Sequence, residues 1–168
     1  MEAISGPEPL SAAHDVKKFD CGKQELTEWP RRYALQNQQA GASRIYVVHR
    51  GGRVIGYYAL AAGSVELAEA PARVKKGLAR HPIPVILLAR LAVDASEHHR
   101  GLGATLLKDA LARIASAAGE IVVRAVLVHA KDDDAKAFYQ RYDFEPSSTD
   151  PLHLFLLIKD LRAALKSR

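Results

Sequence analysis

A short loop with two glycines has the composition of an anion-binding site. Residues 98–103 read His-His-Arg-Gly-Leu-Gly and lie between an apolar run and a segment with helical spacing. Glycine has no Cβ, so the backbone can turn sharply and approach a ligand closely. Free amides at the start of a helix attract negative charge, and the guanidinium of Arg100 suits phosphate oxygens. The pattern therefore predicts a site for a phosphate or pyrophosphate group.

Two common phosphate-binding motifs do not fit this loop. A Walker A loop requires G-x-x-x-x-G-K-[ST], and the sequence contains no such string. A Rossmann loop requires G-x-G-x-x-G, but Leu106 stands at the third glycine position. Two glycines alone more often mark a helix start than a ligand site, so the choice between these two interpretations depends on the surrounding residues.

Positive charge is concentrated in the middle third of the chain. The formal net charge is +5 over 168 residues. Residues 1–30 carry −3, residues 31–93 carry +8, and residues 94–168 are neutral. A basic stretch of this kind is either a solvated face or a surface for a polyanion, such as a nucleic acid or a phosphorylated cofactor.

The composition predicts one folded domain over residues 1–168. Hydrophobic residues make up 48% and charged residues 26%, which is typical of globular proteins. The single cysteine, Cys21, excludes an internal disulfide and fits the reducing cytoplasm. No stretch approaches the ~20 apolar residues of a membrane span, and the first 25 residues show no apolar core of a signal peptide.

Hydrophobic periodicity predicts an α/β (α+β) protein with strands first and then a β-loop-α-β-α-β order. Strands are expected over residues 45–48, 54–65, 85–93, 121–129 and 152–158, with a hairpin turn at Gly51-Gly52. Helices are expected over residues 7–20, 24–39, 70–80, 104–118, 132–142 and 161–166. Pro30 is expected to kink or restart the second of these helices.

Three stretches together resemble the GNAT superfamily of N-acyltransferases: Leu88–Asp94, His98–Ala104, and the Ala135–Phe144 segment that contains Phe138-Tyr139. The resemblance implies a central, mixed, mostly antiparallel sheet flanked by helices and splayed near the strand over residues 85–93. It implies acetyl-CoA as the acetyl donor. The implied cofactor contacts are Leu91, Ala92 and Val93 for the pantetheine arm, and His98, His99, Arg100, Gly101, Leu102, Gly103 and Ala104 for the pyrophosphate. His98 replaces the usual arginine or glutamine, and Asp143 replaces the usual glycine before Phe144.

The N-terminal half is similar to one group within that superfamily, the GNAT toxins of bacterial toxin–antitoxin modules. The matching motifs are Phe19-Asp-Cys-Gly22, Asn37-Gln38, Gly56-Tyr57-Tyr58 and Pro82-Ile-Pro-Val85, whereas Pro30 departs from the usual leucine-type residue. The resemblance implies acetylation of the α-amino group of aminoacyl-tRNA, which blocks translation. It also implies a homodimer and a ribbon-helix-helix antitoxin, with operator DNA bound only through the antitoxin complex.

Tyr139 stands at the acid-tyrosine position of the family, directly after Phe138. The resemblance implies that its phenol, with an ordinary pKa of ~10, protonates the departing CoA thiolate. Without the family context, a core aromatic pair would be the better interpretation. Residues 70–93 contain no carboxylate. This suits an α-amino acceptor with a pKa of ~7.7–8.0 better than a lysine side chain at ~10.4, which would need a base.

Charged tRNA would give the basic stretch a role. The candidate tRNA contacts are Arg73, Lys75, Lys76, Arg80 and Arg90. Arg90 lies on a predicted strand, so it either reaches the acceptor or forms a structural ion pair. The histidines show no metal-ligand spacing, and no metal is expected. Two alternatives remain: a GNAT enzyme acting on a small amine or a protein N-terminus, and a non-catalytic module that binds acetyl-CoA or nucleic acid.

Overall fold

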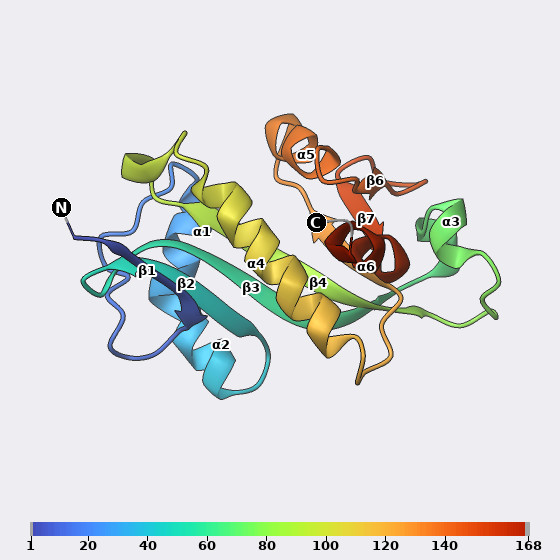
Figure 1. The fold of residues 1–168 in the computed structure, drawn as a ribbon, viewed down its shortest axis with the longest axis horizontal. Coiled ribbons are helices and arrows are strands. Elements are labelled where there is room, and N and C mark those ends of the chain that lie inside the picture. The colour runs from blue at the N-terminus through green and yellow to red at the C-terminus, as the bar shows by residue number, and fades with distance from the viewer. Residues whose placement is uncertain (1, 167–168) are drawn as a thin grey trace. The chain divides into compact units, whose positions relative to one another are not determined.

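The structure is a computed structural model that describes residues 2–166. The chain forms two compact units, residues 1–61 with 89–110 and residues 62–88 with 111–168. Three elements contribute to both units: β3 (Arg53–Val65), β4 (Ile83–Val93) and α4 (Leu102–Ala117) (Figure 1). The order of strands in the seven-stranded sheet is β1-β2-β3-β4-β5-β7-β6. The β4–β5 pair is parallel, and the β1–β2, β2–β3, β5–β7 and β6–β7 pairs are antiparallel, which confirms the predicted mixed sheet.

The first unit begins with a strand that the sequence analysis missed. Residues 7–20 were expected to be helical, but β1 (Ile4–Pro9) pairs antiparallel with β2 (Arg44–Arg50). The prediction was wrong because Pro7 and Pro9 bias the residues before them towards extended backbone. The edge of β2 provides the hydrogen-bond partners of this strand. The predicted hairpin is confirmed: β2 and β3 pair antiparallel across Gly51-Gly52.

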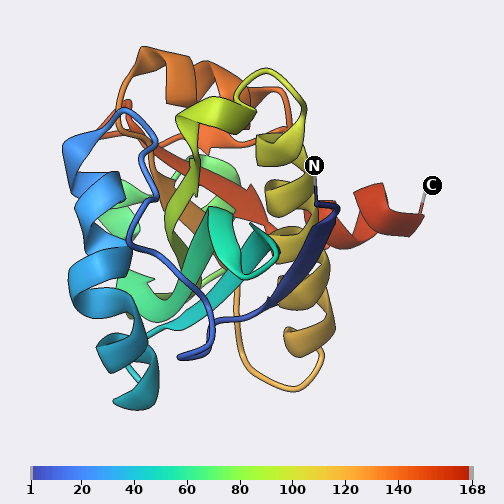
Figure 2. The same ribbon diagram turned by 90° about the vertical axis from the view of Figure 1, so that its left-hand side faces the viewer.

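The helical run over residues 24–39 is interrupted at Pro30, as predicted. Helix α1 (Gln24–Trp29) leads into a π-helical turn, η1 (Pro30–Ala34), and then into α2 (Leu35–Gln39). Proline lacks the backbone donor of a regular helical turn, so the hydrogen-bond ladder shifts here. Trp29 stacks on Tyr57 of β3 at 6.1 Å between ring centroids. Figure 2 shows this run on one side of the strands and α4 on the other.

Gly56 allows α4 to lie close to β3. A Cβ atom there would lie 2.9 Å from Cγ2 of Val48 and 3.1 Å from Cδ1 of Leu106. We expect Gly56→Ala to lower the free energy of unfolding by about 1–3 kcal/mol, since overpacking displaces buried neighbours. Gly119→Ala is the matched control, because its nearest contact would be an ordinary 3.6 Å. Equal urea midpoints for the two variants would contradict this account.

The second unit contains the elements that follow β3 and α4 in the chain. They are η2 (Leu67–Glu69), α3 (Ala72–Lys75), β5 (Ala125–His129), α5 (Asp133–Gln140), β6 (Glu145–Pro146), β7 (His153–Leu157) and α6 (Ile158–Lys166). Helix α3 is shorter than the predicted helix over residues 70–80, and β6 was missed. The strand predicted from residue 121 begins only at Ala125. The amides of Glu120 and Ile121 bond back to the carbonyl of Ala117, so these residues turn around the end of α4.

Strand register sets which residues of β4, β5 and β7 lie opposite one another. Leu127 of β5 lies opposite Phe155 of β7, and His129 lies opposite His153 at the end of the same ladder. The β4–β5 ladder ends at the Leu88–Val128 pair, while β4 itself continues to Val93. Within residues 2–166, no helix is both long and apolar enough to cross a bilayer.

Glu8, His14 and His49 meet in the first unit, although the histidines show no metal-ligand spacing in the sequence. Nε2 of His49 lies 2.5 Å from Oε1 of Glu8, and Nε2 of His14 lies 3.8 Å from Oε2. Nδ1 of each ring accepts a backbone amide, from Ser11 at 2.9 Å and Gly52 at 3.0 Å. Both Nε2 atoms therefore carry the proton of the neutral ring. The geometry favours a hydrogen-bonded cluster over a set of open metal ligands.

This cluster predicts a loss of stability in acid. Burial, together with the neighbouring His49, holds the pKa of His14 below its ordinary value of 6.5. The unfolded chain then binds a proton at higher pH than the folded chain, so the free energy of unfolding falls as pH decreases through 6.5. Urea unfolding at pH 7.5 and 5.5 should show a smaller drop for His14→Gln than for the unmodified protein. The same drop in both would contradict this assignment.

Candidate functional site

Asp94 organises the turn that leaves β4. Its carboxylate accepts the amide of Asp20 at 2.9 Å, the amide of Ser96 at 3.1 Å and the hydroxyl of Ser96 at 2.5 Å. Burial alone would raise the pKa of Asp94, but these hydrogen bonds outweigh burial and hold it below its ordinary value. The carboxylate is therefore a fixed anion that caps the short helical turn η3 (Ala95–Glu97).

Glu97 orients the arginine of the glycine loop. Its carboxylate is buried and lies 2.8 Å from Nη2 of Arg50 and 3.5 Å from Nη1 of Arg100. The hydrogen bond from Arg50 holds the pKa of Glu97 below its ordinary value. The side chain of Arg100 is 54% exposed, so one edge of the guanidinium is held by protein while the rest faces solvent. Glu97 and Arg50 were not among the predicted site residues, although the i,i+3 spacing of Glu97 and Arg100 is a readable signal.

The loop presents unpaired amides at the start of α4. His99 and Gly101 adopt left-handed backbone conformations, with φ of 64° and 79°. The first bond into the helix runs from the amide of Thr105 to the carbonyl of Gly101. Among residues 2–166, the amides from Gly101 to Ala104 find no acceptor. Together with Arg100 they make up a set of donors of the kind that binds an anion.

His98 has a structural contact that the sequence could not show. Its Nε2 lies 2.7 Å from the carbonyl oxygen of Val93, so the ring donates to the end of β4. The imidazole therefore closes the turn between strand and loop, and His99 is the ring left for an external group. Leu91 and Val93 are half-buried, whereas Ala92 packs into the core of the first unit.

Arg90 contacts an aromatic ring rather than a carboxylate. Its guanidinium carbon lies 4.2 Å from the centroid of Trp29, within the range of a cation–π interaction. Its Nε is buried and has no acceptor within the described residues. Of the two predicted roles, this contact favours the structural one, with Trp29 in place of the expected ion-pair partner.

Tyr139 combines a buried ring with an unused hydroxyl. The ring packs edge-on against Phe138 at 5.2 Å and lies 5.5 Å from Phe144. The residue is 8% exposed, and burial raises the pKa of its phenol above the ordinary value of 10.0. The hydroxyl has no hydrogen-bond partner in residues 2–166. Tyr139 is thus part of an aromatic cluster. It is also a protonated acid whose phenolic proton is not donated in a hydrogen bond within residues 2–166.

The predicted basic contacts of the second unit do not form one uniform set. Arg73 makes a paired contact with Asp160 of α6, at 2.8 and 3.1 Å. Arg124, which the sequence analysis missed, donates from Nε to the carbonyl of Val74 at 2.9 Å and from Nη2 to that of Lys76 at 3.2 Å. These two arginines hold the segment around α3 in place.

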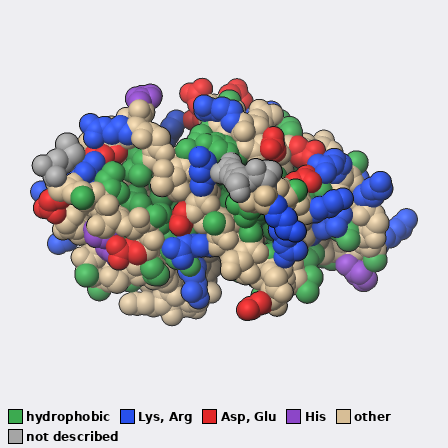
Figure 3. Space-filling view, viewed as in Figure 1, with side chains coloured by type: hydrophobic (Ala, Val, Ile, Leu, Met, Phe, Trp, Pro, Cys, Tyr) green, Lys and Arg blue, Asp and Glu red, His purple; other side chains and the backbone are tan. Residues whose placement is uncertain are grey.

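Three further basic residues lie at the end of α3 or shortly after it. Their side chains are exposed, and none forms an ion pair with a residue in 2–166. This group, called the α3 patch below, consists of Lys75, Lys76 and Arg80. Figure 3 shows lysine and arginine side chains gathered over α3 and the chain that follows it. The positive charge predicted from the sequence is therefore available here, after the charge of Arg73 has been matched by Asp160.

Comparison with known families explains the loop and the strand before it. Residues 41–146 match the model of the acetyltransferase (GNAT) domain, which is more than half of the chain. This chain belongs to the GNAT family. It is therefore an N-acetyltransferase that uses acetyl-CoA, and the predicted fold class and enzyme class are confirmed.

Two proteins, the second in two structures, illustrate what this GNAT enzyme is similar to. A tRNA-acetylating toxin of Mycobacterium tuberculosis (strain ATCC 25618 / H37Rv) is 52% identical over 165 residues, 98% of this chain and 99% of the toxin. The structure of AtaT complexed with acetyl-methionyl-tRNAfMet has a TM-score of 0.87 at 28% identity, over 97% and 98% of the two chains. A tyrosine-to-phenylalanine mutant of AtaT, bound to the C-terminus of the antitoxin AtaR and acetyl-CoA, has a TM-score of 0.81 at 27% identity and covers 97% of both chains.

The anion site of this GNAT enzyme fits the diphosphate of acetyl-CoA. Unpaired amides at a helix start and an arginine held by a buried carboxylate are both donors, and Arg50 matches the charge of that carboxylate, Glu97. The donor set therefore agrees with the use of acetyl-CoA by the family, while His98 makes a structural bond to Val93.

Proposed function

We propose that this chain is a toxin that transfers the acetyl group of acetyl-CoA to the α-amino group of aminoacyl-tRNA and so blocks translation. The observation that carries the proposal is the 52% identity with a tRNA-acetylating toxin over nearly the whole of both chains. The similarity to AtaT, solved with acetyl-methionyl-tRNAfMet, supports the same acceptor. The exposed cations of the α3 patch supply the charge that an RNA acceptor requires.

We assign the donor side to the glycine loop. The amides from Gly101 to Ala104 and the guanidinium of Arg100 bind the pyrophosphate, with His99 and Leu102 completing the loop. The main chain from Leu91 to Val93 pairs with the pantetheine arm. The β4–β5 ladder ends before these residues, at Leu88, which supports this role because their backbone groups are not engaged by β5.

The transfer needs an oxyanion donor and an acid. The amine nitrogen attacks the thioester carbonyl carbon, a C–N bond forms and the C–S bond breaks. A backbone amide near Leu91 or Val93 donates to the oxyanion of the tetrahedral intermediate. Tyr139 gives its phenolic proton to the departing thiolate, and the proton that the attacking nitrogen loses as the amide forms restores the phenol. The raised pKa and unused hydroxyl of Tyr139 support this role.

The same proposal covers partners and location. The chain forms a homodimer in the cytoplasm as a single acetyltransferase domain over residues 1–168, and a ribbon-helix-helix antitoxin encoded beside it neutralises it. Operator DNA is bound only through the antitoxin complex. The AtaT structure with the antitoxin AtaR supports such a partner. The free, buried Cys21 fits a reducing compartment, and the family match, which takes residues from both units, supports a single domain.

The test is a competition between acceptors. The protein is incubated with labelled acetyl-CoA and, separately, with a panel of charged tRNAs, uncharged tRNA, polyamines and a peptide with a free N-terminus. We expect label in the aminoacyl group of charged tRNA and none in uncharged tRNA. Label in amines or peptide without label in any charged tRNA would overturn the proposal.

A further inference from the structure

One arginine of the first unit joins the turn before the glycine loop to a segment far away in sequence. Arg50 is the last residue of β2 and lies 47 positions before Glu97. Its Nη2 donates to Oε1 of Glu97 at 2.8 Å, and its Nη1 donates to the carbonyl of Glu2. The side chains of Arg50 and Glu97 are only 14% and 5% exposed. The two residues therefore form a largely buried ion pair.

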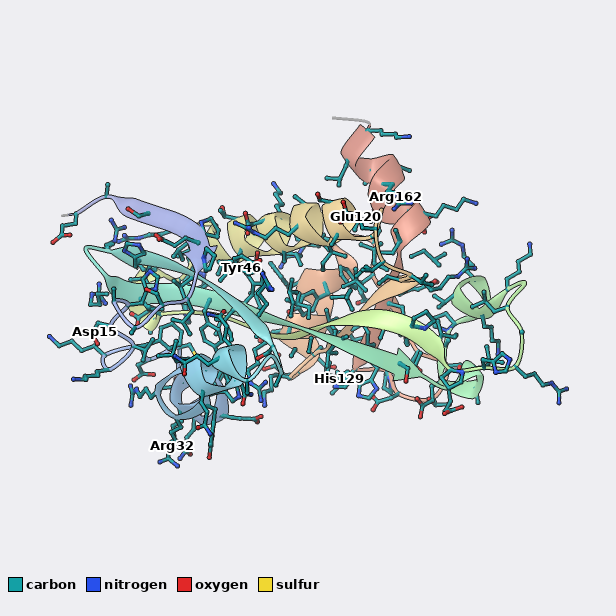
Figure 4. The ribbon with its side chains drawn as sticks, turned by 90° about the horizontal axis from the view of Figure 1, so that it is seen from below. Asp15, Arg32, Tyr46, Glu120, His129 and Arg162 are labelled. Carbon is teal, nitrogen blue, oxygen red and sulfur yellow. The ribbon has the colours of Figure 1, made fainter. Side chains whose placement is uncertain are left out.

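The hairpin of β2 and β3 fixes the backbone from which Arg50 extends. The main chain of Asp15 bonds to this hairpin at two points next to its turn. The amide of Asp15 donates to the carbonyl of Gly52 at 2.7 Å, and the carbonyl of Asp15 accepts the amide of Val54 at 2.9 Å (Figure 4). The guanidinium of Arg50 is therefore presented from a turn that is hydrogen-bonded on both sides.

Two arginines lie next to the same oxygen of Glu97. Nη1 of Arg100 is 3.5 Å from the Oε1 atom that accepts the bond from Arg50, which is longer than the ~2.7–2.9 Å of a charge-assisted hydrogen bond. Arg50 also lowers the pKa of Glu97 more than Arg100 does. The charge of the carboxylate is thus matched mainly by Arg50, and Arg100 keeps most of its donors for another anion.

The loss of Arg50 would change this balance. A buried carboxylate requires a cation beside it, because an uncompensated charge in a protein interior is costly. Without Arg50, Arg100 is the cation that remains in ion-pair contact with Glu97. Its guanidinium would then turn towards the carboxylate. The formal charge of the three side chains would also fall from +1 to 0, which disfavours an anionic ligand.

We propose that Arg50 is a positioning residue for the acetyl donor: by matching the charge of Glu97, it leaves Arg100 free to bind the diphosphate of acetyl-CoA. Arg50 acts through Glu97 and not by touching the donor, so its removal is harmful only while residue 97 carries a negative charge. The inference rests on the proposed assignment of Arg100 to the diphosphate. It is independent of the acceptor, because it concerns the binding of CoA alone.

A double-mutant cycle of Arg50→Gln and Glu97→Gln tests this dependence. The dissociation constant of CoA is measured by calorimetry for the unmodified protein, the two single variants and the double variant. We expect Arg50→Gln to raise the dissociation constant about 10-fold in the unmodified background, and by less than about 3-fold in the Glu97→Gln background. Equal losses in both backgrounds would overturn the inference, since Arg50 would then attract or contact the donor directly.

The stability of the variants is measured alongside by thermal melting. Arg50→Gln leaves a buried carboxylate without its main partner, which lowers stability, whereas the double variant contains no such charge. If Arg50→Gln does not fold, the comparison of Glu97→Gln with the double variant still decides how Arg50 acts. Similar CoA affinities in those two proteins support action through Glu97, and a loss of about 10-fold in the double variant contradicts it.

Three controls separate the contact with Glu97 from a general effect of charge. Arg50→Lys keeps a cation beside Glu97 and should recover most of the CoA affinity that Arg50→Gln loses. Arg44→Gln removes the same charge from the opposite, exposed end of β2 and should bind CoA as the unmodified protein does. Pantetheine lacks the diphosphate, so its binding, followed by NMR titration, should be the same for Arg50→Gln and the unmodified protein.

Arg100→Gln distinguishes failure of the inference from failure of the donor assignment. If Arg100→Gln leaves CoA binding unchanged, the assignment of Arg100 to the diphosphate is wrong. If Arg100→Gln weakens CoA binding and Arg50→Gln does not, the donor assignment stands and the positioning role of Arg50 is wrong. None of these measurements contains tRNA, so a failure to acetylate aminoacyl-tRNA would overturn the proposed function without affecting them.

Discussion

Replacing Tyr139 by phenylalanine is expected to reduce acetyl transfer to aminoacyl-tRNA by about 10²- to 10⁴-fold, the usual contribution of a general acid. Without the phenolic proton, the CoA thiolate must leave as an anion or take its proton from water. The ring and its packing against Phe138 and Phe144 remain, so folding and acetyl-CoA affinity should not change. Single-turnover transfer from labelled acetyl-CoA, together with calorimetric binding of CoA, measures the two effects separately.

Tyr142 provides the matched control for this prediction. It lies close to Phe138, at 5.5 Å between ring centroids, but it has no assigned role in the transfer. Tyr142→Phe removes the same atom from a neighbouring tyrosine and should retain nearly full activity. If Tyr139→Phe keeps both acetyl transfer and growth inhibition, Tyr139 is not the acid and belongs only to the aromatic cluster.

Removing the charges of the α3 patch should weaken the binding of aminoacyl-tRNA but not that of acetyl-CoA. In the triple variant Lys75→Ala, Lys76→Ala and Arg80→Ala, we expect KM for aminoacyl-tRNA to rise about 10- to 100-fold at ordinary ionic strength. The slope of log affinity against log salt should become shallower by about 2–3, because each cation that neutralises a phosphate contributes about 0.7–0.9. Acetyl-CoA binding should be unchanged.

A second triple variant with the same loss of charge elsewhere distinguishes direct contacts with tRNA phosphates from general electrostatic attraction. Lys17, Lys18 and Lys108 are exposed and lie outside the α3 patch. Replacing these three by alanine lowers the net charge by the same amount, and we expect the salt slope to stay near that of the unmodified protein. If the two triple variants behave alike, or if neither affects tRNA acetylation, the α3 patch is ordinary solvated surface.

Local patterns were enough to predict most of the elements. The strands β2, β3 and β4 and the helices α4 and α5 appear close to their expected ranges, because apolar periodicity reports directly which face of an element is buried. The glycine loop was predicted for a similar reason, since a turn with a left-handed residue at Gly101 and a helix start are properties of a few adjacent residues. Such information lies within a short window of sequence.

The parts that were missed depend on pairing with distant residues. The β1 segment became a strand because β2 offered an edge, not because its own residues favour a strand strongly. The assignment of His98 to phosphate could not anticipate its bond to the carbonyl of Val93. Arg90 was expected to face an acceptor or a carboxylate, and it lies over Trp29 from a helix far away in sequence.

By itself, the sequence determined the GNAT family, the donor loop, the order of elements and the position of the basic charge. Tertiary structure decided which of those charges remain available, because Asp160 matches Arg73 and Glu97 holds Arg100. It also decided that His129 and His153 meet above an apolar cavity. The physical reason is strand register, since a shift of one residue along β7 would turn His153 to the opposite face and separate the pair.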